Sequence, residues 1–131
     1  MTIDKYTNLF NHHTECLKQA FVDLNLAMAE DEALTDFMQG RVLYRYEHAL
    51  EYAFKSMQSF IAIQDEFELD YEKIISKAKY YHLIENEDIW HQMLADSNLQ
   101  DHCCKKIDDK RIQSAINGEY SRQIKLLIER L

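Results

Sequence analysis

The sequence predicts an all-α protein, an up-and-down helical bundle of four to five helices in a single domain over residues 1–131. The chain contains no Pro and only two Gly, whereas the turns between β-strands use both residues often. Apolar residues recur every three or four positions over long stretches, which is the period of an amphipathic helix. With 131 residues, the chain has the length of one domain with one core.

Two long helices are predicted first. One apolar stripe covers about 26 residues, formed by Ile3, Tyr6, Phe10, His13, Leu17, Ala20, Leu24 and Met28. After a polar run, Thr35 or Asp36 can cap a second helix over about residues 36–64. Apolar side chains cover a wide arc of this helix, so we expect it to lie at the centre of the domain.

Two short helices and one longer helix complete the prediction. Residues 64–70 form a linker, and Asp70 is a suitable N-cap for a helix over residues 71–83. Glu85 or Asn86 then starts a fourth helix. A last helix runs from about residue 106 to the end, with an apolar stripe of Ile112, Ile116, Tyr120, Ile124, Leu127 and Leu131. Gly118 inside it costs about 1 kcal/mol relative to Ala and suggests close approach of a neighbouring helix.

Composition excludes several classes of function. Phosphate-binding loops, dinucleotide fingerprints and nucleophile elbows all need clustered glycines, so no cofactor is expected. A formal net charge of −8 argues against DNA or another extended nucleic-acid backbone as partner. One basic patch exists at Lys105, Lys106, Lys110 and Arg111, but Asp residues interrupt it, which favours a solvated helix face.

The expected location is the cytoplasm, without membrane contact. No segment approaches the roughly 20 apolar residues of a membrane span, and the N-terminal residues have no apolar signal region. Cys16, Cys103 and Cys104 form an odd set, and neighbouring cysteines on a helix rarely bridge each other, so we expect reduced thiols. His102, Cys103 and Cys104 are consecutive and cannot converge on one ion, so no metal site is predicted.

The segment that is most informative about function is residues 90–104, which read WHQMLADSNLQDHCC. Asn98 and His102 are four apart and would lie about 40° from each other around a helix. They form either a structural hydrogen bond or a binding site. Trp90, with Tyr80 and Tyr81, belongs either to the core or to a platform for a nucleobase.

A second polar set lies on the predicted central helix. Glu47, Glu51 and Lys55 are spaced four apart, and Arg45 precedes them. They form either a surface ladder of ion pairs or the border of a groove that meets His102.

These two regions resemble the nucleotidyltransferase substrate-binding proteins of the HEPN superfamily over roughly residues 34–104. Residues 41–60 are similar to the family's second helix, with Arg45, Tyr46, Glu47, Glu51, Phe54 and Lys55 in matching places. Residues 76–104 are similar to its third and fourth helices, with Leu83, Ile84, Trp90, Met93, Leu94, Asp96, Asn98, Leu99 and His102.

The resemblance implies a helical bundle that forms a homodimer and binds a separate small nucleotidyltransferase. Such pairs are typical of bacteria and archaea, and many resemble toxin–antitoxin systems. In those systems the HEPN protein is a metal-independent ribonuclease with an Arg-x4-His motif, and a Tyr two residues after the His can be nucleotidylated. This chain has Ser97 in place of the Arg and Cys104 in place of the Tyr.

Ser97 cannot supply the charge and forked donors of a guanidinium, so we expect ribonuclease activity to be weak or absent. The resemblance then predicts a non-catalytic substrate-binding subunit of a small nucleotidyltransferase. Nucleotide or RNA are its candidate ligands, and no catalytic residue is assigned unless it is His102. The predicted binding residues are Arg45, Glu47, Glu51, Asp96, Asn98 and His102. The alternatives are a degenerate ribonuclease toxin and a structural protein without partner chemistry.

Overall fold

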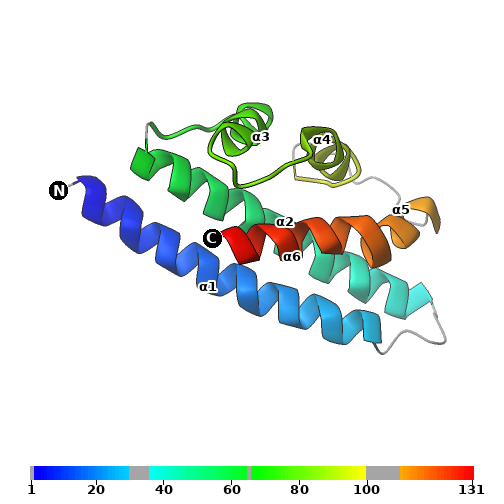
Figure 1. Ribbon diagram of the computed structural model, residues 1–131. Coiled ribbons are helices and arrows are strands. Elements are labelled where there is room, and N and C mark those ends of the chain that lie inside the picture. The colour runs from blue at the N-terminus through cyan, green and yellow to red at the C-terminus, as the bar shows by residue number, and fades with distance from the viewer. Residues whose placement is uncertain (1, 30–35, 65, 100–109) are drawn as a thin grey trace.

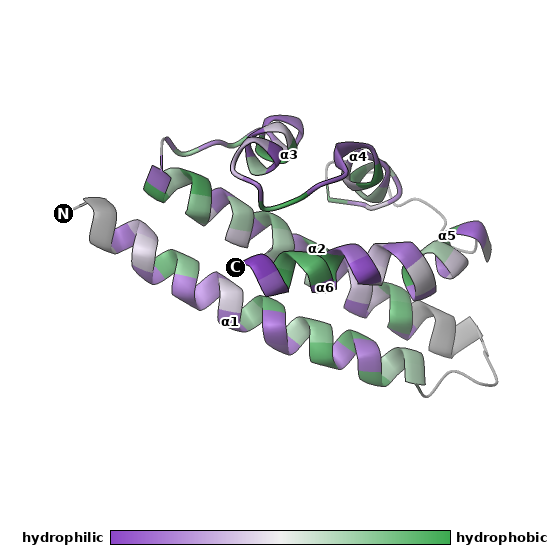
Figure 2. Cartoon of the chain, in the orientation of Figure 1, coloured by the Kyte–Doolittle hydropathy of each residue, from purple (hydrophilic) through white to green (hydrophobic). Residues whose placement is uncertain are grey.

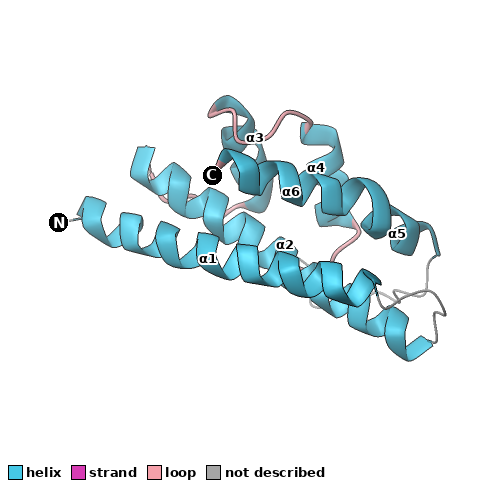
Figure 3. Cartoon of the chain, turned by 60° about the horizontal axis from the view of Figure 1, so that its bottom comes forward, coloured by secondary structure: helices cyan, strands magenta, loops and turns pink. Residues whose placement is uncertain are grey.

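The structure is a computed structural model, and it describes residues 2–29, 36–64, 66–99 and 110–131. In these ranges every regular element is a helix (Figure 3), so the all-α fold class is confirmed. The elements are α1 (Thr2–Ala29), α2 (Asp36–Gln64), α3 (Tyr71–Tyr80), α4 (Glu87–Ala95), α5 (Lys110–Ala115), the π-helical segment η1 (Ile116–Tyr120) and α6 (Ser121–Arg130). α5, η1 and α6 follow one another without a break and form one C-terminal helix.

The long helices form the body of the bundle. α1, α2 and α6 are seen from the side in Figure 1, whereas α3 and α4 are seen nearly end-on, so the short helices lie across the long ones. α1 and α2 share the most extensive interface, and α2 also contacts α3 and α6. The predicted central position of the second helix is therefore confirmed.

The apolar stripes of the helices meet in one core. Hydrophobic and hydrophilic residues alternate around the long helices (Figure 2), as expected for helices with one buried face. Leu17 and Leu24 of α1 pack with Leu50, Phe54 and other buried residues of α2, and each of the four is at most 1% exposed. Burial of such a side chain contributes about 1.5–3 kcal/mol. No helix in the described ranges is long and apolar enough to cross a membrane.

Both short helices begin at the predicted caps. The Asp70 carboxylate accepts a hydrogen bond from the backbone N–H of Glu72 at 2.9 Å, and the Asn86 side-chain oxygen accepts one from Ile89 at 3.2 Å. These bonds satisfy N–H groups that have no partner inside the helix.

The third helix stops at Tyr80, three residues before its predicted end. His82 has a φ of 62°, in the left-handed region that non-glycine residues adopt at a cost. The N–H of Leu83 donates to Ala78 and that of His82 to Lys79, which is the bonding pattern of a Schellman cap. The chain therefore turns sharply here and leads into α4.

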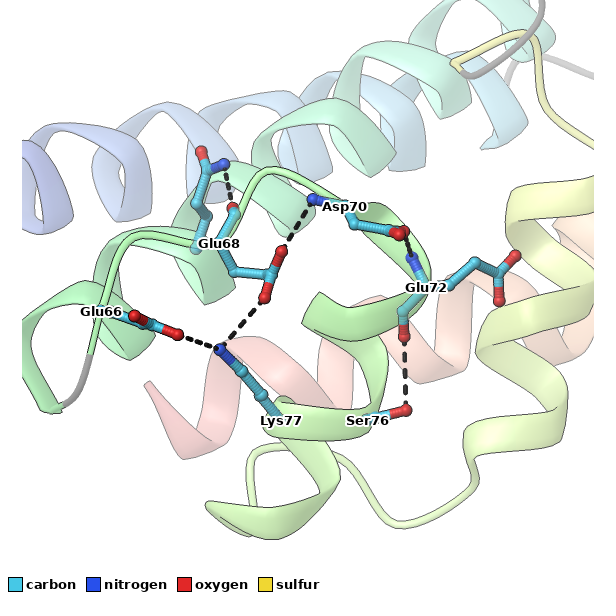
Figure 4. Close-up of polar contacts among 7 residues, drawn as sticks. Glu66, Glu68, Asp70, Glu72, Ser76 and Lys77 are labelled. Atoms are coloured by element: carbon cyan, nitrogen blue, oxygen red, sulfur yellow. Dashed lines mark hydrogen bonds and ion pairs between the residues drawn. The ribbon is translucent and has the colours of Figure 1, made fainter.

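The linker between α2 and α3 is fixed by polar contacts (Figure 4). Lys77 of α3 lies 3.7 Å from Glu66 and 3.1 Å from Glu68, and Gln58 of α2 donates to the backbone oxygen of Glu68. The Glu68 carboxylate also accepts from the N–H of Asp70. That N–H and the Lys77 ammonium lower the pKa of Glu68. The linker thus has a defined path to the cap of α3.

The C-terminal helix departs from the prediction in two ways. It is described from Lys110, because residues 106–109 of its predicted start lie outside the described ranges. Its middle turn, η1, is π-helical, which adds about one residue to that turn and changes the direction of the side chains. The prediction that Gly118 allows a neighbouring helix to approach is wrong, since no atom of another described element lies within 4 Å of the position of a Cβ there.

Candidate functional site

Glu47 and Asn98 are joined across the fold. One carboxylate oxygen of Glu47, on α2, accepts hydrogen bonds from the backbone N–H and the side-chain amide of Asn98, both at 3.0 Å. The two residues are 51 positions apart in the sequence and both are half-buried. Hydrogen bonds to an ionised carboxylate are stronger than those between neutral groups. The pair therefore fastens the segment after α4 to the central helix and orients the Asn98 amide.

Ser97 forms the turn that presents Asn98. Its hydroxyl donates to the backbone oxygen of Leu94 at 2.7 Å and accepts from the N–H of Leu99 at 3.3 Å. The residue is 1% exposed, so its side chain satisfies its own hydrogen bonds inside the protein. The position that would hold the motif's Arg in the resembling family is thus occupied by a buried, uncharged turn residue.

Asp96 connects the same segment to the C-terminal helix. Arg111 of α5 donates to both carboxylate oxygens of Asp96, at 3.1 and 3.3 Å, in the forked geometry that suits a guanidinium. The hydroxyl of Tyr120, in η1, donates to the same carboxylate at 2.5 Å. The π turn places Tyr120 toward α4, and the carboxylate receives three hydrogen bonds.

Tyr46 lies beside these groups. Its ring stacks on that of Tyr120, with centroids 5.9 Å apart and planes 21° apart. Its hydroxyl is buried and has no hydrogen-bond partner among the described residues. Burial raises the pKa of Tyr46 well above its usual value, and the neighbouring Tyr120, Asp96 and Glu47 add to the shift. Burial and the bond to Asp96 also raise the pKa of Tyr120.

Together these residues form a polar cluster, which we call the Glu47–Asn98 cluster: Tyr46, Glu47, Asp96, Asn98 and Tyr120, with Arg111 at its edge. Both phenols are protonated at neutral pH, as an ordinary tyrosine is, and the raised pKa of each makes loss of the proton harder still. The cluster offers an amide, two carboxylates and a guanidinium, which suit the binding of polar groups.

Two predicted site residues do not join this cluster. Arg45 points to α1, where it lies 4.0 Å from Asp23. Glu51 pairs with Lys55 at 3.4 Å, and both side chains are about 40% exposed. The interpretation as a surface ion pair therefore fits Glu51 and Lys55. Glu47, in contrast, binds Asn98. Residues two apart on a helix point about 160° away from each other, which separates Arg45 from Glu47.

Of the two alternatives left open for Trp90, Tyr80 and Tyr81, the structure supports a core position for Trp90 and not a nucleobase platform. Trp90 is 0% exposed and meets Phe54 edge-on, with ring planes at 90°, so neither face is open to a base. Tyr80 is 74% exposed and contacts only Tyr81 among the rings of the described residues. Trp90 is a core residue.

His102, Cys103 and Cys104 lie outside the described residues, so the predicted Asn98–His102 pair stays a prediction. Within the described ranges, no group of three or more His, Cys, Asp or Glu side chains is placed to hold a metal ion. Cys16 is a free thiol.

Sequence reasoning missed Arg111 and Tyr120 as partners of Asp96. Arg111 was assigned to a solvated face and Tyr120 to the apolar stripe. A Tyr in an otherwise aliphatic stripe indicates a polar contact inside the protein, because a buried hydroxyl usually finds a hydrogen-bond partner. No local pattern would have identified Asp96 as that partner.

Comparison with known protein families identifies a match. A family model described as "Nucleotidyltransferase substrate binding protein like" matches residues 12–131. This range covers most of α1 and everything after it, including the whole Glu47–Asn98 cluster. No curated protein matches the chain.

Proposed function

Since the chain belongs to the nucleotidyltransferase substrate-binding protein family, we propose that it is the non-catalytic subunit of a two-protein system. It binds a small nucleotidyltransferase and contributes part of the surface that holds the transferase's substrate. The Glu47–Asn98 cluster and His102 provide that surface. The resemblance also favours a homodimer, which the exposed side chains of Val22, Leu26 and Tyr44 on the long helices support.

The observation that carries the non-catalytic role is the environment of Ser97. Metal-independent cleavage of RNA builds negative charge on a phosphate, and a nearby cation has to stabilise that charge. Ser97 is uncharged, buried and hydrogen-bonded within its own turn. A side chain so engaged supports a binding role for the Asn98 segment in place of the ribonuclease chemistry of the resembling family.

The cluster's chemistry supports recognition of a polar ligand. Glu47 fixes the backbone and amide of Asn98 by two bonds, so the amide is oriented before a ligand arrives. A pre-oriented group loses less entropy on binding than a mobile one. Nucleotides and RNA present the donors and acceptors that an amide and a carboxylate can bind.

The experiment is to purify the tagged protein from its source cells and identify bound proteins by mass spectrometry. We expect a small nucleotidyltransferase in stoichiometric amount. With the two proteins purified, Asn98→Ala and His102→Ala should each weaken transferase or substrate binding by about tenfold. Glu51→Ala, on the same helix as Glu47 but outside the cluster, should bind as the wild type. Recovery of the protein without a transferase, or wild-type binding by both variants, would refute the proposal.

A residual ribonuclease is the second candidate, and Arg111 is the observation that favours it. Its guanidinium lies against Asp96, the residue before Ser97, so a cation is present near the altered motif. This candidate predicts RNA cleavage and growth arrest that disappear in both His102→Ala and Arg111→Ala. Absence of cleavage by the wild type, together with toxicity created by Ser97→Arg, would leave only the binding role.

A further inference from the structure

A pocket opens on another part of the molecule, between the α3–α4 connection and the C-terminal helix. Its volume is about 310 Å³, within the range of sites for small molecules. Residues 83–86, the first half of α4, and η1 with α6 line it. It shares no residue with the Glu47–Asn98 cluster, so that cluster does not account for it. We call it the α4–α6 pocket.

The inner wall of the α4–α6 pocket is apolar. Leu83, Ile84, Trp90 and Leu127 line it and are each at most 4% exposed. Ile89 and Leu126 also line the pocket and are partly exposed, so a ligand can reach the apolar wall there. Flat ring systems fit such a wall, because they bury a large apolar area with little loss of internal freedom.

The outer wall carries two arginines. Arg122 is 65% exposed and donates to Glu119, and Arg130 donates to the backbone oxygen of His82 and to the Glu85 carboxylate. A guanidinium has five N–H groups, so these bonds leave donors on both arginines for a further acceptor. Arginine recognises carboxylate, phosphate and sulfonate groups by this kind of forked donation.

We propose that the α4–α6 pocket binds a small aromatic anion. The ring system lies against Ile89 and Leu126, and the anionic group lies at the rim and accepts from Arg122. The proposal does not depend on a transferase partner, because every residue it uses lies in this chain and outside the Glu47–Asn98 cluster.

Two dyes that differ by one group test the proposal on the full chain. The probe 8-anilinonaphthalene-1-sulfonate has the rings and the anion, and N-phenyl-1-naphthylamine has the same rings without the sulfonate. Trp90 is the single Trp of the chain and lines this pocket, so its emission is quenched by energy transfer when a dye binds there, while the rim variants identify the site. We expect one sulfonated dye per chain, with quenching of Trp90, and weaker binding of the neutral dye.

Variants of the rim then separate the anion site from general apolar binding. Arg122→Gln should weaken binding of the sulfonated dye about fivefold, as loss of a charge-assisted contact, and leave the neutral dye unchanged. Because Arg122 is largely exposed, this variant keeps the fold, which circular dichroism checks. Lys125→Gln removes one positive charge from an exposed position of α6 outside the pocket lining, and this variant should bind both dyes as the wild type. Equal affinity for the two dyes, no effect of Arg122→Gln, or binding without quenching of Trp90 would overturn the proposal.

Discussion

Replacing Glu47 by Ala should destabilise the protein more than is usual for the replacement of a partly exposed residue on a helix. The substitution removes two hydrogen bonds of 3.0 Å between one carboxylate oxygen and Asn98. A hydrogen bond to a charged group contributes about 1.5–3 kcal/mol, and partial solvent access reduces that value. We therefore expect a loss of about 2–4 kcal/mol in the free energy of unfolding for Glu47→Ala. Glu47→Gln keeps an acceptor oxygen without its charge and should lose about 1 kcal/mol.

The assay is urea unfolding followed by circular dichroism and by the fluorescence of Trp90. Glu51→Ala is the matched control, because Glu51 lies one turn further along α2 and forms an exposed ion pair with Lys55. Such pairs contribute less than about 0.5 kcal/mol. A double-mutant cycle of Glu47→Ala and Asn98→Ala should give a coupling of about 1 kcal/mol or more. If Glu47→Ala lowers the free energy of unfolding no more than Glu51→Ala does, the Glu47 carboxylate does not anchor Asn98. The reasoning behind the Glu47–Asn98 cluster would then be refuted.

Four further predictions concern single side chains. Tyr120→Phe should cost about 1–3 kcal/mol because its hydroxyl donates to Asp96, whereas Tyr46→Phe removes an unpartnered buried hydroxyl and should be neutral or stabilising in the same unfolding assay. His82→Gly should stabilise by about 1 kcal/mol, since glycine adopts the φ of 62° without strain, and a fall in Tm would contradict this. Burial, with nearby Lys55 and His12, lowers the pKa of His13 below 6.5. The unfolded chain therefore binds the proton first, stability is lost as pH falls below 6.5, and His13→Gln should flatten that loss in unfolding measured from about pH 7 to 5.

The positions of the helices could be predicted because they depend on neighbours in the sequence. Apolar spacing located α2 at residues 36–64, and the side chains of Asp70 and Asn86 cap helices that begin one residue later. A cap bonds to an N–H two or three residues away, and a stripe repeats within one turn, so both are visible in a short window. The end of α3 was missed, because a histidine in a left-handed cap has no sequence pattern of its own.

The candidate site was predicted only in part. The resemblance identified Glu47, Asp96 and Asn98, which the fold brings together. It could not separate them from Arg45 and Glu51, which share the same helix with Glu47 but contact other neighbours. Sequence spacing gives the angle between two side chains on one helix, but it does not give the neighbour that each side chain meets.

The sequence by itself thus determined an all-helical chain, its caps and its apolar faces, because 3.6-residue periodicity and capping are local properties. Only the tertiary structure decided that Glu47 binds a residue 51 positions away, that Tyr120 reaches Asp96 through a π turn, and that Trp90 lies in the core beside the α4–α6 pocket. These contacts depend on how whole helices pack against one another. Packing is set by the combined fit of many side chains, so no short segment of the sequence contains the information.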